Sequence, residues 1–203
     1  MKNKRYFPLY VDLSDKNVVV VGGGTIATRR VKALLLFTRN ITVIAPKMTA
    51  DLWELGKLGK IQIQPRPVKK SDFSMAYMVL AVTNNRELNE EIYHACKEEG
   101  IYVNVASDKD LCDFYFPGIC LKDDVVVGIT ASGMNHKKAR AVREKVQALL
   151  EEIAKDGFLQ AEIETNGSID LKPFCDIENR PSFTMDYKLP LSGMEKHMCL
   201  ENF

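Results

Sequence analysis

Short apolar runs alternate with helix-spaced apolar positions along the first half of the chain. Continuous β-branched runs such as Val18–Val21 suit strands buried on both faces, as in parallel sheets. We predict strands at residues 17–21, 41–45, 61–64, 76–82 and 101–106. Helices are predicted after Gly24, after a Thr49 cap and over residues 87–98. This β-α-β rhythm with short connections indicates an α/β fold with a Rossmann-type, doubly wound parallel sheet.

The pattern changes after Asp113. Apolar runs at 114–120 and 125–130 predict a hairpin, and residues 137–153 predict a helix with one apolar stripe. Prolines interrupt the remainder, which we interpret as an irregular C-terminal tail. We therefore expect three regions, at residues 1–113, 114–157 and 158–203. The middle region is too small to bury its own apolar stripe, so it must pack on the first region or on a second subunit.

A glycine-rich turn follows the first predicted strand, in a segment that fits G-x-G-x-x-A. In such a turn Gly22 permits a tight bend, Gly24 lets a pyrophosphate approach the backbone, and Ala27 allows close helix–strand packing. The helix that begins there offers free N–H groups and a positive dipole end to phosphates. The context of strand, turn and helix predicts a dinucleotide site and favours an oxidoreductase.

Two further segments lie at the same predicted edge of the sheet. The second strand ends near Pro46 without the Asp or Glu that often holds the ribose of NAD. Backbone groups or Thr49 remain as ribose partners, and Lys47 is a candidate for a 2′-phosphate, so these residues leave NAD and NADP open. Thr83 and Asn84 follow the fourth strand, where they either line the ligand crevice or cap the next helix.

Composition narrows the function further. The 203 residues carry a net charge of +1, so the whole chain has no strong field for nucleic acid or a membrane. No apolar run approaches the roughly 20 residues of a membrane span, and no signal-peptide stretch follows the N-terminus, so we expect a cytoplasmic protein. The five cysteines are irregularly spaced, which favours free thiols over a disulfide framework.

Several segments match one family in collinear order. They are residues 6–13, the triple glycine with 27–30, 43–46, 81–85 with 88–89, 103–105, 111–117, 132–133, and 139–140 with 143–145. With these segments the sequence resembles the precorrin-2 dehydrogenase and sirohydrochlorin ferrochelatase family of sirohaem synthesis, over about residues 5–150. The resemblance implies a homodimer built by region 114–157 and NAD-dependent oxidation of precorrin-2 to sirohydrochlorin. Many members also insert Fe²⁺.

The resemblance also implies cofactor contacts at Thr25, Ile26, Pro46 and Lys47. Together with the glycine turn and the strand ends, the full set of expected cofactor contacts is Gly22, Gly24, Thr25, Ile26, Pro46, Lys47, Thr83, Asn84 and Asn104. The predicted last helix begins with a basic cluster of His136, Lys137, Lys138, Arg140, Arg143 and Lys145. Such a cluster either attracts an acidic tetrapyrrole or forms a solvated helix face. We favour substrate or dimer contacts for Arg140 and Arg143, with His136 as a further substrate candidate.

One position departs from the family pattern. The family has a functional aspartate three residues after the position of Asn104, where this chain has Ser107, followed by Asp108. Serine is neither a carboxylate base nor a hard metal ligand at neutral pH. Ser107 and Asp108 are therefore the catalytic candidates, and the chelatase reaction is the one more directly affected. The alternative function is a catalytically reduced carrier or sensor that binds NAD or a tetrapyrrole.

Overall fold

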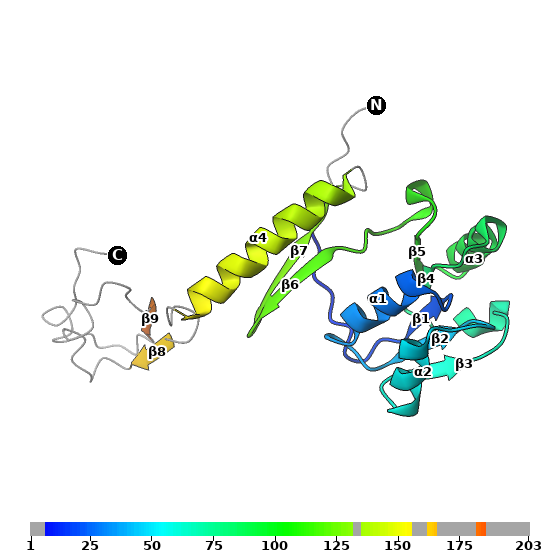
Figure 1. Ribbon diagram of the computed structural model, residues 1–203, viewed down its shortest axis with the longest axis horizontal. Coiled ribbons are helices and arrows are strands. Elements are labelled where there is room, and N and C mark those ends of the chain that lie inside the picture. The colour runs from blue at the N-terminus through cyan, green and yellow to red at the C-terminus, as the bar shows by residue number, and fades with distance from the viewer. Residues whose placement is uncertain (1–6, 132–134, 156–161, 166–181, 186–203) are drawn as a thin grey trace, which may run out of the picture. The chain divides into compact units, whose positions relative to one another are not determined.

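The computed structural model describes residues 7–131, 135–155, 162–165 and 182–185. Its main sheet has five parallel strands in the order β3-β2-β1-β4-β5 (Figure 1). The strands are β1 (Val18–Val21), β2 (Ile41–Ile44), β3 (Gln62–Gln64), β4 (Met78–Ala81) and β5 (Tyr102–Val105). The order reverses beside β1, so the chain winds outward in both directions, and the predicted doubly wound fold is confirmed.

Helices cover both faces of this sheet. They are α1 (Thr25–Leu34), α2 (Ala50–Lys57) and α3 (Arg86–Glu98), and the 3₁₀ turns are η1 (Lys70–Phe73) and η2 (Lys109–Leu111). Alternate strand residues face opposite sides. Val18 and Val20 therefore pack in the core under α1 and α2, whereas Val19 and Val21 pack in the core with α3. Burial on both faces explains why the strand sequences are continuous apolar runs.

Helix caps follow the sequence closely. Thr49 Oγ1 accepts the N–H of Leu52 at the start of α2 (3.4 Å), which confirms the predicted cap. Asn85 Oδ1 accepts the N–H of Leu88 at the start of α3 (3.1 Å). Both caps hold the loops that leave the carboxyl edge of the sheet. The 3₁₀ turns η1 and η2 were not predicted, because so short a helix carries no apolar period.

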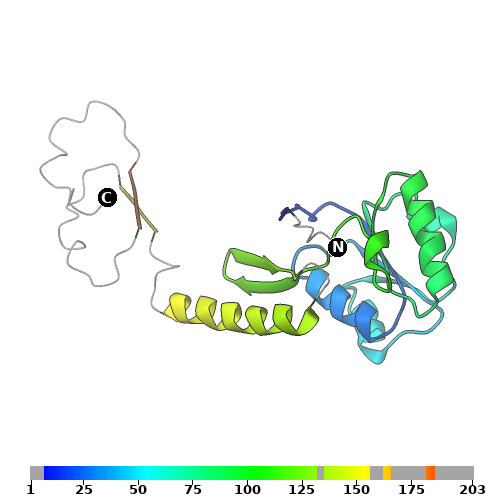
Figure 2. The same cartoon turned by 90° about the horizontal axis from the view of Figure 1, so that it is seen from above.

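A second unit contains the hairpin β6 (Gly118–Lys122) and β7 (Val125–Ile129) and the helix α4 (His136–Lys155) (Figure 2). The two strands are joined by only two residues, one of which, Asp123, has φ +51°. On α4 the backbone C=O of Arg143 accepts the Cys120 thiol (3.2 Å), and Gln147 Nε2 donates to the C=O of Leu121 (3.4 Å). These contacts pack α4 against β6.

The chain divides into Met1–Gly118 with Thr130–His136, and Ile119–Ile129 with Lys137–Phe203. Phe114 and Phe116 pack against the core of the first unit. Within the predicted tail, β8 (Glu162–Thr165) pairs in parallel with β9 (Ser182–Met185), and the other tail residues lie outside the described part. None of the described helices is long and apolar enough to cross a membrane.

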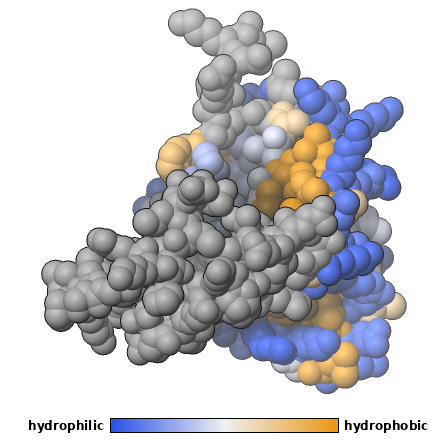
Figure 3. Space-filling view, turned by 90° about the vertical axis from the view of Figure 1, so that its left-hand side faces the viewer, coloured by the Kyte–Doolittle hydropathy of each residue, from blue (hydrophilic) through white to orange (hydrophobic). Residues whose placement is uncertain are grey.

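Large apolar side chains reach the surface in both units, and hydrophobic areas lie among hydrophilic ones in the space-filling view (Figure 3). On α4, Val142 is 41% exposed and Leu149 is 53% exposed, although Leu150 and Ala154 are buried. The predicted apolar stripe is therefore only partly covered within the described chain.

Candidate functional site

The turn after β1 is shaped by close backbone contacts. Gly22 has φ +129°, and a Cβ there would lie 2.6 Å from the carbonyl oxygen of Val82 beside β4. A Cβ on Gly23 would clash with the carbonyl oxygen of Lys47. The carbonyl of Gly23 in turn accepts the N–H of Thr49 (2.9 Å). The fold therefore requires the first two glycines, and it packs the β2–α2 loop onto the turn.

Gly24 differs from its two neighbours. It is exposed, and a Cβ there would meet no protein atom within 4 Å. Gly24 is the N-cap of α1, and no side chain in the described part of the protein caps this helix. Ala27, three residues on, is completely buried against the sheet. The protein leaves open the space beside Gly24 and the N–H groups of the first turn, as a pyrophosphate site requires.

The predicted cofactor contacts on α1 and after β2 come together at this edge. Thr25 and Ile26 lie in the first turn of α1, and both are exposed; for Ile26 the exposed fraction is 44%. Pro46 and Lys47 are exposed in the loop after β2. Because the N–H of Gly22 donates to the C=O of Ile44 (3.0 Å), the ends of β1 and β2 are adjacent.

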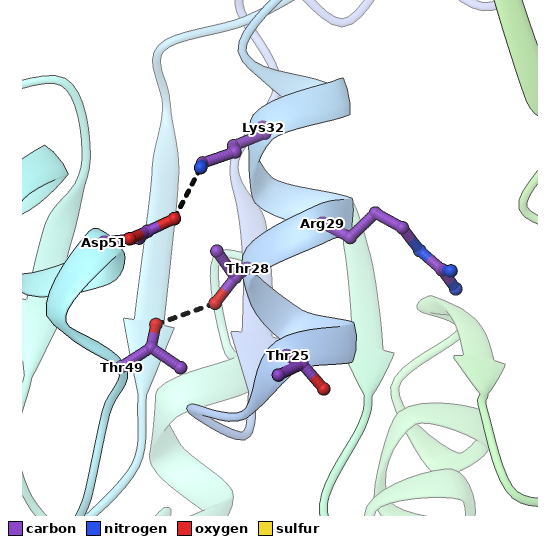
Figure 4. A pocket seen from close by; sticks show the side chains of 6 residues that line it. All are labelled: Thr25, Thr28, Arg29, Lys32, Thr49 and Asp51. Atoms are coloured by element: carbon purple, nitrogen blue, oxygen red, sulfur yellow. Dashed lines mark hydrogen bonds and ion pairs between the residues drawn. The ribbon is translucent and has the colours of Figure 1, made fainter.

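A pocket of about 390 Å³ opens between α1 and α2 (Figure 4). Its lining residues are Thr25, Thr28, Arg29, Lys32, Thr49 and Asp51. The hydroxyls of Thr28 and Thr49 are 2.7 Å apart, and Lys32 forms an ion pair with Asp51. Thr49, the predicted ribose partner, thus already bonds to Thr28 and to the N-terminus of α2.

The loop after β4 is organised by a buried side chain that sequence reasoning missed. Asn89 of α3 is completely buried, and its amide bonds to the backbone and hydroxyl of Thr83. Asn84 is exposed. The predicted alternative of a helix-capping loop is confirmed, although Asn85 provides the cap. Thr83 and Asn84 lie just after β4 at the carboxyl edge of the sheet, and their contact with a cofactor stays a prediction.

Asn104 in β5 is buried, and both ends of its amide bond to the protein. Its Nδ2 donates to the C=O of Phe114 (2.7 Å), and its Oδ1 accepts from Arg30 of α1 (2.5 Å). The Arg30 guanidinium lies over the ring of Phe116 (5.2 Å), and burial lowers the pKa of this group to about 10. Asn104 therefore joins α1 to the segment after β5. No sequence signal distinguishes Arg30 from the other basic residues of α1.

Ser107 and Asp108 have different surroundings in the loop after β5. Ser107 is exposed, and its Oγ accepts from Asn89 Nδ2 (3.1 Å). Asp108 Oδ1 accepts the N–H of Asp110 (2.9 Å), and its Oδ2 accepts from the exposed Arg86 (3.2 Å). Both residues lie at the carboxyl edge of the sheet, and their catalytic roles stay predictions.

The lysines and arginines of α4 belong to the second unit. Arg140 donates to Glu144 (2.8 Å), and Arg143 lies 3.8 Å from the same carboxylate. The side chain of His136 lies outside the described part. Contacts of His136, Arg140 and Arg143 with a substrate stay predictions. No group of three or more His, Cys, Asp or Glu suited to a metal ion occurs among the described residues.

Residues 9–118 match the family model described as "Putative NAD(P)-binding". The chain is 40% identical over 144 residues to "Probable multifunctional siroheme biosynthesis protein HemA" of Ruminiclostridium josui, covering 70% of this chain and 28% of that protein. It is 34% identical over 146 residues to "Siroheme synthase" of Nitrosococcus oceani, covering 72% of this chain and 31% of that protein. The chain thus spans less than a third of these relatives.

The fold also matches a solved structure. SirC, precorrin-2 dehydrogenase, superposes with a TM-score of 0.64 at 24% identity, covering 76% of each chain. The family model, over residues 9–118, covers the glycine turn and the loops at the carboxyl edge of the sheet. The chain therefore belongs to the family described as putative NAD(P)-binding, and it is similar to part of proteins named for sirohaem biosynthesis.

Proposed function

We propose that this protein oxidises precorrin-2 to sirohydrochlorin with NAD⁺ in sirohaem biosynthesis. The observation that carries the proposal is the open space at Gly24, in a turn whose other two glycines the fold itself requires. Gly24 lies at an uncapped helix N-terminus, and no contact within the described part of the protein requires a glycine there. The close approach of a pyrophosphate would explain why this position has no side chain. The substrate class is supported by the relatives named for sirohaem biosynthesis.

The residues at the carboxyl edge suit the parts of the cofactor. The first turn of α1 offers its N–H groups to the pyrophosphate, and Ile26 offers an exposed apolar surface. Pro46 and Lys47 lie where the ribose of a dinucleotide is held in this fold class. When bound, the nicotinamide supplies the two-electron acceptor of the reaction. We propose NAD rather than NADP because of the family resemblance, and Lys47 is the residue whose substitution tests that choice.

Oxidation of precorrin-2 also releases a proton, which needs an acceptor. In the loop after β5 the candidate acceptor is Asp108, which directly follows Ser107 and whose Oδ2 accepts from the exposed Arg86. The substrate carries a rim of carboxylates, so we propose that Arg140 and Arg143 attract it through their charge. Because Glu144 pairs with both arginines, a substrate carboxylate must compete with that contact.

We also propose that the protein is a homodimer that joins through its second unit. Val142 and Leu149 on α4 are exposed apolar side chains, and the hairpin with one helix offers little core of its own. Covering such a surface with a second copy removes it from water. Sedimentation of the purified chain tests this, because a monomer at micromolar concentration contradicts the proposal.

The decisive experiment incubates the purified full chain with precorrin-2 and NAD⁺ or NADP⁺, and follows reduced cofactor and the tetrapyrrole spectrum. We expect reduced cofactor to form with NAD⁺ and without any metal. Asp108→Ala should lower the rate at least tenfold, whereas Asp15→Ala, an exposed carboxylate before β1, is the matched control. Undiminished turnover in Asp108→Ala contradicts the role of this carboxylate. Binding of both ligands without turnover supports the carrier or sensor function.

A second candidate reaction is insertion of Fe²⁺ into sirohydrochlorin. It is favoured by the family, but Ser107 occupies the position of the family's aspartate. Adding Fe²⁺ or Co²⁺ to the same assay tests it, since metal insertion changes the tetrapyrrole spectrum. We expect chelation to be slow in the native protein and to increase in Ser107→Asp, because a carboxylate accepts pyrrole protons or binds the incoming ion.

A further inference from the structure

Asn89 connects the two loops that leave β4 and β5. Its side chain is completely buried in α3, and its amide makes four hydrogen bonds. Oδ1 accepts from the backbone N–H of Thr83 (3.2 Å) and from the Thr83 hydroxyl (2.7 Å). Nδ2 donates to the backbone C=O of Thr83 (3.0 Å) and to Ser107 Oγ (3.1 Å). This amide therefore uses both of its donors, and Oδ1 shares the single hydrogen of the Thr83 hydroxyl with the C=O of Asn85 (2.9 Å).

The orientation of the Asn89 amide is determined by the backbone of Thr83. A backbone N–H only donates and a backbone C=O only accepts, so Oδ1 must face the first and Nδ2 the second. Nδ2 consequently also faces Ser107, whose Oγ must accept. The hydroxyl hydrogen of Ser107 is then available for another acceptor. No acceptor for it occurs among the described residues, and Ser107 is exposed at the carboxyl edge.

We propose that Asn89 is a positioning residue that makes Ser107 a hydrogen-bond donor to an oxygen of the ligand bound at this edge. The proposal rests on the proposed function and names the chemistry of one contact within it. The acceptor is a carbonyl or carboxylate oxygen, which is present on the nicotinamide carboxamide and on the tetrapyrrole side chains. Kinetics with each substrate varied in turn distinguish these two sources.

The same geometry explains how this chain differs from relatives with aspartate at this position. An aspartate also accepts from Asn89 Nδ2, so the anchor is kept. Its outward oxygen, however, is an acceptor when ionised, whereas the serine hydroxyl is a donor. Serine in place of aspartate therefore changes the group that faces the ligand from a hydrogen-bond acceptor to a donor.

The experiment compares Ser107→Ala, Ser107→Thr and Ser107→Asp in the full chain, with Ser74→Ala as a matched control. Ser74 is an exposed serine whose hydroxyl donates to Ser71. We expect Ser107→Ala to raise the KM of one substrate five- to twentyfold, and Ser107→Thr, which keeps the donor, to lose much less. The substrate whose KM changes identifies the source of the acceptor. Equal kinetics in Ser107→Ala and the native protein overturn the proposal.

Ser107→Asp provides a readout that a structural role would not change. A protonated carboxyl donates and a carboxylate does not, so kcat/KM of this variant should fall as the pH rises through the pKa of the introduced group. The native protein should lack that ionisation. A pH profile of Ser107→Asp that is parallel to the native one contradicts the proposal.

Asn89→Ala tests the positioning step. If Asn89 acts through Ser107, the double variant Asn89→Ala with Ser107→Ala should lose little more kcat/KM than Asn89→Ala alone, whereas independent effects multiply.

Titration with NADH and with sirohydrochlorin gives the same comparison for ligand affinity, without turnover. Absence of native turnover therefore counts against the proposed function, while unchanged ligand affinity in Ser107→Ala counts against the donor role.

Discussion

The turn after β1 and the loop after β5 face the same edge of the sheet, but different forces shape them. Backbone atoms determine the first, because Gly22 and Gly23 would place a Cβ against the carbonyl oxygens of Val82 and Lys47. Side-chain amides determine the second, through Asn89 and Asn104. The turn tolerates no added side chain at Gly22 or Gly23, and the loop depends on the side-chain amides of Asn89 and Asn104. One edge thus combines a turn shaped by steric contacts with a loop shaped by side-chain hydrogen bonds.

The largest loss of stability should come from adding a side chain at Gly22 in the turn after β1. Gly22→Ala combines a positive φ with a clash against β4, so we expect a loss of about 3 kcal/mol or more in unfolding free energy. Gly100→Ala is the matched control, because Gly100 has φ +68° but open space at its Cβ, and should lose only about 1 kcal/mol. Urea denaturation measures both. Equal losses would show that backbone conformation alone, without close packing, determines the turn.

Removing an amide from the loop should have the next largest effect. Asn104→Ala leaves the Arg30 guanidinium and the C=O of Phe114 without their partner, at a cost of about 1–3 kcal/mol. Asn84→Ala, at an exposed asparagine, should change the stability by less than about 0.5 kcal/mol. Denaturation curves of the two variants give the comparison. A loss in Asn104→Ala as small as that of its control would contradict the importance of side-chain bonding in this loop.

Gly24→Ala should separate cofactor binding from stability. A Cβ there contacts no protein atom, so we expect the unfolding free energy to change by less than about 1 kcal/mol. If a pyrophosphate approaches this glycine, NAD affinity should fall at least tenfold, which is about 1.4 kcal/mol. Isothermal titration with NAD⁺ measures the affinity. Unchanged binding would mean that the cofactor does not lie against Gly24.

The smallest effect concerns a thiol that reports the packing of the β5 loop. Burial raises the pKa of Cys112, whose Sγ accepts the N–H of Val105 (3.3 Å). Since the thiolate is the nucleophile, alkylation by iodoacetamide at pH 8 should be slower than for free cysteine, and should accelerate only at higher pH. Cys96 should react more slowly still, because burial raises its pKa to about 12.

Peptide mass spectrometry after timed alkylation measures both thiols, and the denatured chain provides the control in which burial is removed. Asn104→Ala should accelerate the reaction of Cys112 and leave Cys96 unchanged, because Asn104 Nδ2 donates to the Cys112 sulfur (3.5 Å) as well as to the C=O of Phe114. Reaction of native Cys112 at the rate of free cysteine would show that the loop is open rather than packed.

The elements of the first unit were predictable because they depend on local periodicity. The strands at residues 17–21 and 41–45 differ from β1 and β2 by only one residue, since β-branched runs identify a strand buried on both faces. Thr49 was predictable as a cap because its side chain needs only an N–H three residues on. Arg30 and Asn89 were not, because their partners lie 74 and 18 residues away along the chain.

The sequence by itself determined the glycine turn after β1, the α/β winding and the NAD(P)-binding family, since these depend on Cβ sterics and on short-range patterns. It also identified Ser107 and Asp108 as the catalytic candidates, at the position where the chain departs from the family pattern. Only the tertiary structure decided what surrounds these two residues, because the crossover from β4 through α3 to β5 brings Asn89 beneath Ser107. Whether the Ser107 hydroxyl donates or accepts depends on Asn89, its partner in the folded chain. No local sequence pattern identifies that partner.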